Sequence, residues 1–306
     1  MKTSLDHLPA GKRRELELVV EILAASFAKA VADRKVDRLK NGKILKIILF
    51  GSYARGDWVE DPVGRYFSDF DLLVVVDDDD LADTVEFWDI AEARLLKELS
   101  AGKVLRTPVN FIVHSLQDVN HQLERGRYFF VDIVRDGVLL LDVPGHPLTT
   151  PKDLAPATAL DEAKGYFDQW LESAADFEDQ ATYAVSKGRL KNAAFQMHQA
   201  AEHFYNCVLL VLTLYTPKSH NLVRLRNLAE PLDPRLIAVW AFDTKFEKRC
   251  FELLRAAYIK ARYSRHFKVT ADELEWLGQR VAALKTAVTA VCEERLEALE
   301  TQIAAE

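Results

Sequence analysis

Two short motifs in the first quarter of the chain carry residue types suited to phosphate chemistry. Gly51 and Ser52 directly follow the apolar segment 43–50. A glycine lets the backbone approach an anion without a Cβ clash, a serine adds a hydroxyl donor, and a helix beginning at Tyr53 would direct free N–H groups at the same anion. Arg55, in the first turn of that helix, could contact phosphate through two N–H groups. The motif therefore indicates a phosphate-binding turn, although an ordinary strand-to-helix turn has the same local pattern.

The second motif is a pair of aspartates separated by one residue. In a strand, alternate residues face the same side, so Asp69 and Asp71 would project together while Phe70 packs on the opposite face. Two adjacent carboxylates repel each other unless a cation lies between them. Mg²⁺ suits this arrangement, because it binds through one or two carboxylates together with substrate phosphates. An edge strand with solvent-facing acids is the alternative, but the apolar residues 72–76 favour a strand inside a sheet.

Hydrophobic periodicity predicts the elements that position these motifs. Helices are predicted at 13–34, 81–99, 116–123 and 128–135, and strands at 43–50, 70–76, 109–113 and 138–142. They indicate an N-terminal α/β domain with a small mixed sheet over residues 1–142, in which 40–142 form the core.

The composition changes after this domain. Residues 143–158 contain four prolines and a glycine, so we interpret 143–156 as a linker. The pattern beyond it is helical, with helices predicted at 159–187, 190–214, 235–264 and 270–302 and a loop at 216–221. Residues 157–306 are therefore predicted to form an all-α antiparallel bundle, which makes the whole chain α+β.

Composition and charge exclude several classes of protein. The net charge of −7 over 306 residues argues against stable DNA binding and against an anionic membrane surface as partner. The longest apolar stretch, 207–215, is far shorter than the ~20 residues that span a bilayer. Three cysteines without metal-ligand spacing, and an N-terminal segment without an apolar targeting core, predict a cytoplasmic protein.

Together the two motifs carry a family resemblance. Gly51, Ser52 and Arg55 within GSYARGDW, with Asp69 and Asp71 within SDFDLLVVV, resemble the nucleotidyltransferase fold of the DNA polymerase β superfamily, in its minimal nucleotidyltransferase branch. The resemblance covers roughly residues 40–142. It implies that the Gly-Ser turn holds a nucleoside triphosphate and that the aspartates are catalytic ligands of Mg²⁺ or Mn²⁺. The implied reaction transfers a nucleoside monophosphate, AMP from ATP, to a hydroxyl of an unidentified small molecule or protein.

This sequence departs from the family pattern in two places. The gap between Ser52 and Asp69 is longer than usual, and residues 57–66 read as an inserted loop. The family's third carboxylate is replaced by Asn110, which could orient a substrate but could not act as a base at neutral pH. His114, on the same predicted strand face, is a substitute base in one interpretation and a polar strand end in the other.

The C-terminal half contains a basic helix face. Arg255, Tyr258 and Arg262 fall at helical spacing within the basic segment 245–268, and Arg265 continues the face. Such a face predicts binding of an anionic ligand, such as the phosphate end of a nucleotide. A solvated face paired with nearby acids is the alternative.

The helical half resembles a HEPN domain (higher eukaryotes and prokaryotes nucleotide-binding). The resemblance rests on FQMHQAAEHFYNCVLLVL, PKSHNL and AYIKARYS and covers roughly 157–300. It implies an antiparallel bundle that often accompanies minimal nucleotidyltransferases, and by analogy a homodimer through the helical domain. Some HEPN proteins are ribonucleases with four to six residues between Arg and His, whereas Arg262 and His266 are separated by three.

The second predicted helix of this half carries His198, Glu202 and His203. A metal site is one interpretation of these three residues. Two histidines on the polar side of a bundle helix is the interpretation that we favour.

Three functional hypotheses follow from the sequence. The first is a Mg²⁺-dependent nucleotidyltransferase whose catalytic residues are Asp69, Asp71 and Asn110. Its nucleotide would contact Gly51, Ser52 and Arg55, with the basic face at Arg255, Tyr258 and Arg262 also binding nucleotide. The second hypothesis is a catalytically impaired nucleotide-binding regulatory protein, which Asn110 favours. The third is a toxin–antitoxin-related fusion whose HEPN half acts on RNA.

Overall fold

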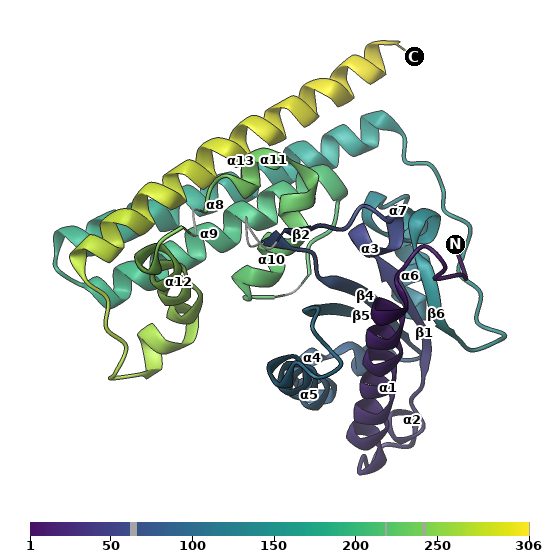
Figure 1. The fold of residues 1–306 in the computed structure, drawn as a ribbon. Coiled ribbons are helices and arrows are strands. Elements are labelled where there is room, and N and C mark those ends of the chain that lie inside the picture. The colour runs from purple at the N-terminus through teal and green to yellow at the C-terminus, as the bar shows by residue number, and fades with distance from the viewer. Residues whose placement is uncertain (62–65, 218, 241–242, 306) are drawn as a thin grey trace. The chain divides into compact units, whose positions relative to one another are not determined.

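The computed structural model describes residues 1–61, 66–217, 219–240 and 243–305 (Figure 1). Parts of the predicted loops 57–66 and 216–221, and of the predicted helix 235–264, lie outside the described residues. The chain divides into two compact units, Met1–Asp153 and Leu154–Glu306. The division falls inside the proline-rich segment 143–156.

The N-terminal unit is built on a four-stranded mixed sheet in the order β5-β4-β1-β6. Its strands are β1 (Ile44–Phe50), β4 (Phe70–Val76), β5 (Val109–Ser115) and β6 (Val138–Asp142). β1 runs antiparallel to β4 and β6, whereas β4 and β5 are parallel. The mixed sheet predicted from the sequence is therefore confirmed. β-branched and leucine residues fill these strands, and β4 is buried along most of its length.

Helices cover both faces of this sheet. Leu72 and Val74 join one core cluster with α1 (Ala10–Ala32), α4 (Thr84–Phe87) and α5 (Asp89–Ala101). Alternate strand residues point to the opposite face, which α6 (Leu116–Glu124) and α7 (Tyr128–Asp136) contact. The short elements are α2 (Asp37–Lys40), α3 (Gly51–Arg55) and the 3₁₀ turn η1 (Asp79–Ala82).

A hairpin of two short strands, β2 (Glu60–Asp61) and β3 (Tyr66–Phe67), lies between β1 and β4 in the chain. Two hydrogen bonds close its base: Ser68 N–H donates to the Val59 carbonyl, and Val59 N–H donates to Ser68 Oγ, both at 2.9 Å. The two chain ends that carry the loop are thereby fastened to each other.

The regular secondary structure of the C-terminal unit is helical, and its described residues contain no strand. Its long helices are α8 (Pro156–Ser186), α9 (Leu190–Thr213), α12 (Lys245–Tyr263) and α13 (Ala271–Ala305). α9 is the most buried of them and contacts α8, α12 and α13 (Figure 1). With the mixed sheet of the first unit, this bundle gives the α+β fold that the sequence predicts.

Local caps divide two of the predicted helices. The predicted helix 81–99 is not continuous. Asp83 accepts hydrogen bonds from Val85 N–H and Glu86 N–H, and this cap starts a new helix, α4, at Thr84. The predicted helix 235–264 is likewise wrong as a single helix. It consists of α11 (Pro234–Ile237) and of α12, which begins after a capping box between Thr244 and Glu247.

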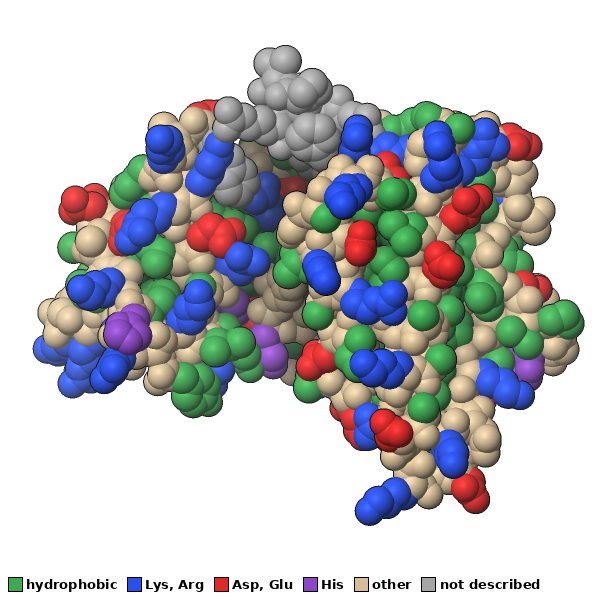
Figure 2. Space-filling view, turned by 60° about the horizontal axis from the view of Figure 1, so that its bottom comes forward, with side chains coloured by type: hydrophobic (Ala, Val, Ile, Leu, Met, Phe, Trp, Pro, Cys, Tyr) green, Lys and Arg blue, Asp and Glu red, His purple; other side chains and the backbone are tan. Residues whose placement is uncertain are grey.

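α10 (Leu222–Ala229), followed by the 3₁₀ turn η2 (Glu230–Leu232), begins at an Asn221 cap that the sequence analysis did not predict. Among the described helices, none combines the length and apolar character needed to cross a bilayer. Basic and acidic side chains are both spread over the face drawn in Figure 2, and basic side chains gather at its lower left.

Candidate active site

Sheet topology brings the two phosphate-chemistry motifs to one end of the sheet. Because β1 is antiparallel to β4, the end of β1 lies beside the start of β4, and Phe50 pairs with Asp71. Because β5 is parallel to β4, its start lies there too, and Asp71 pairs with Asn110. Gly51, which follows Phe50, therefore lies at the same sheet end as the aspartates.

Gly51 is required at this position for two reasons. Its φ is +73°, in the left-handed region that favours glycine. A Cβ placed on Gly51 would also lie 2.6 Å from Asp71 Oδ2, so the carboxylate occupies the space that any other side chain would need. The backbone of the turn and the Asp71 carboxylate are thus in close contact. The helix that follows, α3, begins at Gly51 and not at Tyr53 as predicted.

Asp69 and Asn110 form the neighbouring pair. Asn110 Nδ2 donates a hydrogen bond of 2.9 Å to Asp69 Oδ2. Burial raises the pKa of Asp69 above its ordinary value, and the hydrogen bond from Asn110 only partly opposes this shift. A cation bound beside Asp69 would offset the cost of keeping this carboxylate charged.

The donor set fits a magnesium ion that is completed by substrate. No cluster of three or more His, Cys, Asp or Glu side chains with metal-site geometry occurs among residues 1–61, 66–217, 219–240 and 243–305. Mg²⁺ does not need one, because it binds through one or two carboxylates and takes its other ligands from water and phosphate oxygens. Asp69 and Asp71 would supply such a pair of carboxylates.

Arg55 lies at the last residue of α3, where it faces acidic side chains. Its Nε donates to Asp57 Oδ2 at 3.1 Å, and its charge also acts on Asp132 and Asp136 of α7. Burial nevertheless raises the pKa of Asp132, and the hydrogen bond from Arg135 is the main cause of the lowered pKa of Asp136. The sequence pattern does not indicate this acidic neighbourhood, because α7 follows α3 by more than 70 residues. Arg55 remains a predicted phosphate ligand.

His114 does not lie near the aspartates. It follows Asn110 by four residues on β5, which corresponds to about 13 Å along a strand, and its partner on β4 is Val75. The His114 Nδ1–H donates to Asp118 Oδ2 at 2.6 Å, which holds the ring toward α6. The interpretation of His114 as a substitute for the third carboxylate is therefore wrong.

In the C-terminal unit, two of the four residues predicted on the basic face are in direct contact. The Arg262 guanidinium lies 4.4 Å from the Tyr258 ring centre and 5.0 Å from that of Phe195, and its Nε donates to the Tyr258 carbonyl. Aromatic rings at these distances attract a guanidinium through cation–π interaction. Arg255 pairs instead with Glu252, one turn earlier on α12.

Behind Tyr258 lies a histidine–glutamate cluster. The His220 ring stacks on Tyr258 at 4.3 Å between ring centres, and His220 Nδ1 lies 2.9 Å from Glu202 Oε1. His198 is fully buried, donates from Nδ1 to the Leu254 carbonyl, and faces Glu202 from its other nitrogen at 3.5 Å. The expectation that His198 lies on the polar side of its helix is therefore wrong, because α9 is the central helix of the bundle.

Glu202 is expected to make the stability of this unit pH-dependent. Burial alone would raise the pKa of Glu202, but His198 and His220 outweigh it and hold that pKa below its ordinary value. A lowered folded-state pKa contributes stability that is present above the unfolded value, about 4.3, and is lost as the pH falls through the folded value. Glu202→Gln should lower the free energy of unfolding by about 2 kcal/mol at pH 7.

Urea denaturation between pH 3 and 7 measures this effect. The difference between parent and Glu202→Gln should shrink toward acidic pH, and the exposed Glu297 supplies the matched control Glu297→Gln. A difference that stays constant over this pH range would contradict the assignment.

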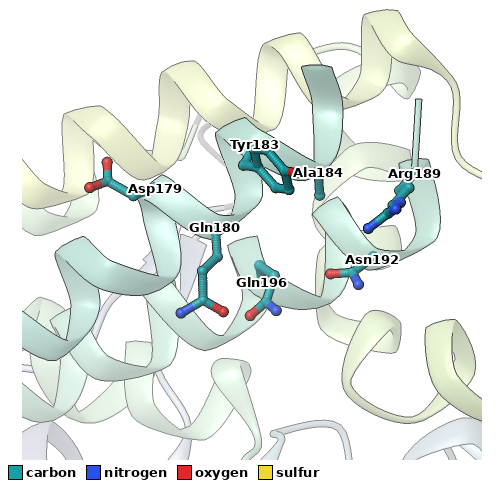
Figure 3. Close-up of a pocket in the computed structure, with 7 residues that line it drawn as sticks. All are labelled: Asp179, Gln180, Tyr183, Ala184, Arg189, Asn192 and Gln196. Carbon is teal, nitrogen blue, oxygen red and sulfur yellow. The ribbon is translucent and has the colours of Figure 1, made fainter. Parts of the chain in front are cut away.

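A surface cavity of about 410 Å³ lies between the end of α8 and the start of α9 (Figure 3). Tyr183, Arg189 and Asn192 are among its lining residues, all of which Figure 3 labels. The lining includes none of the residues predicted to bind nucleotide or metal.

Comparison with known proteins agrees with this geometry. Residues 32–124, which contain β1, α3, β4 and β5, match the nucleotidyltransferase domain family. The N-terminal unit thus contains a nucleotidyltransferase domain. Residues 167–290 match the HEPN domain family. The chain is therefore a fusion of a nucleotidyltransferase domain with a C-terminal HEPN domain.

One curated relative is similar over a short region. A candidate protein adenylyltransferase of Methanocaldococcus jannaschii is 58% identical over 38 residues. This region is 12% of the present chain and 32% of the relative, so the chain matches about a third of that protein's length.

Proposed function

We propose that the N-terminal unit transfers a nucleoside monophosphate, AMP from ATP, to a hydroxyl acceptor. The observation that carries the proposal is the contact between Gly51 and the Asp71 carboxylate. This contact places a glycine turn, which phosphate can approach closely, directly beside one of the two aspartates. The match to the nucleotidyltransferase family supports the same reaction class.

Each site residue has a chemical role in this proposal. The backbone at Gly51 and the hydroxyl of Ser52 hold the triphosphate, and Arg55 adds a positive charge. Asp69 and Asp71 hold Mg²⁺, or Mn²⁺ in its place. When bound, the ion neutralises charge on the triphosphate and activates the attacking oxygen. In the transfer, the acceptor oxygen bonds to the α-phosphorus, pyrophosphate leaves, and the hydroxyl proton passes to solvent.

Asn110 has a supporting part in this proposal. Its hydrogen bond fixes the orientation of Asp69 and stabilises the charged form of that buried carboxylate. Its amide could not accept the hydroxyl proton at neutral pH.

A protein hydroxyl is the acceptor that we favour. The name of the similar archaeal protein describes transfer of an adenylyl group to a protein, and a small-molecule hydroxyl is the other candidate.

We further propose that Tyr258, Arg262 and Arg255 form a second nucleotide contact in the HEPN unit. The caged guanidinium of Arg262 supports this, because its ring contacts orient it before an anion binds.

Transfer of label from α-³²P nucleotides tests the proposal. The protein is incubated with Mg²⁺ and each of the four ribonucleoside triphosphates, either alone, with a cell protein extract, or with a panel of small alcohols. We expect label on protein with ATP and none with the double variant Asp69→Asn/Asp71→Asn. No labelled product from the parent under any of these conditions would refute the proposal.

The second candidate is a nucleotide-binding regulatory protein with impaired catalysis, and Asn110 is the observation that favours it. Calorimetric titration separates the two candidates: tight ATP binding without any product supports the regulatory function. Binding together with turnover supports the transferase.

Asn110→Asp and Asn110→Ala both remove the amide that donates to Asp69, but only the aspartate restores a carboxylate that can accept the hydroxyl proton. We therefore expect the turnover number of Asn110→Asp to exceed that of Asn110→Ala by about tenfold or more at pH 8, whereas Asn110→Ala should fall below the parent. Initial rates at saturating ATP measure both effects. Equal rates for the two variants would show that a carboxylate at this position does not act as a base, and a parental rate in Asn110→Ala would show that the hydrogen bond to Asp69 has no positioning role.

A further inference from the structure

The segment that precedes α1 contacts the end of α3. Lys2 Nζ donates to the Ala54 carbonyl at 3.0 Å, and His7 Nε2 lies 2.8 Å from the Tyr53 carbonyl. A carbonyl only accepts hydrogen bonds, so His7 donates through Nε2–H. Two basic side chains from the first seven residues thus reach the element that begins with Gly51.

The backbone of this segment is itself anchored on the sheet. Lys2 forms a parallel bridge to Val138 at the start of β6. Its N–H donates to the Gly137 carbonyl and its carbonyl accepts from Leu139 N–H, both at 2.9 Å. The Lys2 ammonium therefore extends from a fixed backbone.

These contacts complete the hydrogen bonding of a short helix. The last carbonyls of a helix have no partners within it. In α3, the Ser52 carbonyl accepts from Gly56 and Asp57 N–H of the following turn. The next two carbonyls accept from His7 and Lys2. The positive charge of Lys2 at this end also interacts favourably with the partial negative charge of the last helix carbonyls.

The position of α3 determines the position of the phosphate-binding turn. Tyr53 is buried, with its ring centre 4.5 Å from that of Phe70 and 5.4 Å from that of Trp58. Phe70 lies between the two aspartates in the chain. Ring packing thus holds one side of α3 on the aspartate strand, and the N-terminal segment holds its carbonyl end. Because α3 has only five residues, movement of that end would shift Gly51 against Asp71.

We propose that Lys2 and His7 are positioning residues for nucleotide binding. They fix α3 so that Gly51 and Ser52 stay in register with Asp71, and they act on the nucleotide only through the turn. This inference rests on the proposed function of that same site. It predicts that loss of both contacts weakens ATP binding more than it slows the chemical step.

Two double variants of the full chain test the proposal. Lys2→Met/His7→Leu removes both donors, whereas Lys2→Arg/His7→Gln keeps an N–H donor at each position. For the first variant we expect the amides of residues 52–57 to exchange hydrogen at least about tenfold faster, because the helix end opens more often. We expect its KM for ATP to rise about tenfold with a smaller change in kcat. The second variant should restore both quantities, and Lys35→Met, at an exposed lysine, serves as the surface-charge control.

The outcomes separate this inference from the proposed function. Parental exchange and parental KM in Lys2→Met/His7→Leu would overturn it. So would a rise in KM that Lys2→Arg/His7→Gln fails to reverse, or one without faster exchange at 52–57. If the parent protein neither binds nor transfers nucleotide, the proposed function fails, and the positioning role fails with it. Faster exchange in the first variant would then show only that the contacts hold α3 in place.

Discussion

Replacing Asp71 by asparagine is expected to reduce nucleotidyl transfer by about a thousandfold. Asparagine has nearly the same shape, so it should fit beside Gly51 as the aspartate does. It removes the negative charge with which we propose that the site holds its metal ion. Initial rates of AMP transfer at saturating ATP and Mg²⁺ measure the effect. Asp89→Asn, at an exposed position in the first turn of α5, is the matched control and should keep parental activity.

The size of the loss and its dependence on Mg²⁺ together test whether the Asp71 carboxylate is a metal ligand. A metal ligand should also make the rate of Asp71→Asn respond more steeply to Mg²⁺ concentration than that of the parent. Retention of more than a tenth of the parental rate, with an unchanged Mg²⁺ dependence, would show that Asp71 is not a ligand in the reaction.

Gly51→Ala is expected to reduce transfer by at least about a hundredfold, because small displacements of positioning groups are costly in catalysis. The left-handed backbone at φ +73° costs an alanine about 1–2 kcal/mol. In addition, its Cβ would lie 2.6 Å from Asp71 Oδ2, so the turn and the carboxylate must separate. Transfer rate, ATP affinity by calorimetry, and unfolding in urea measure these effects.

The chain supplies controls for each part of this effect. Gly145 has φ +89° and no atom within 4 Å of its would-be Cβ, so Gly145→Ala introduces strain without a clash. Gly165, within α8, has an ordinary φ and open space, so its alanine variant should be neutral or stabilising. Equal ATP affinity in Gly51→Ala and Gly145→Ala would show that contact with Asp71 has no part in binding.

Strand positions and the mixed sheet could be predicted because they depend on local composition and periodicity. The strand 70–76 begins and ends where its apolar run predicts. Gly51 and the two aspartates belong to two short motifs, each of which can be recognised from its own residues. The proximity of Gly51 to Asp71 depends on the antiparallel pairing of β1 with β4. No single segment encodes that pairing.

The errors arise where tertiary contacts override local pattern. His198 is an ionisable residue, yet it is fully buried because α9 packs against α8, α12 and α13. His114 shares a strand face with Asn110, but that shared face does not overcome the length of strand between them. Lys2 and His7 belong to no motif, and only the folded backbone brings them to α3.

The bonded pair of Val59 and Ser68 has a consequence for finding related sequences. Because these two residues fasten the loop at its base, insertions between them can lengthen the loop without displacing Gly51 or Asp69. The entropic cost of closing the loop rises only slowly with its length. A search pattern that fixes the spacing between the glycine–serine pair and the aspartates would reject this chain. Patterns that allow variable spacing there should recover further members that carry the same two motifs.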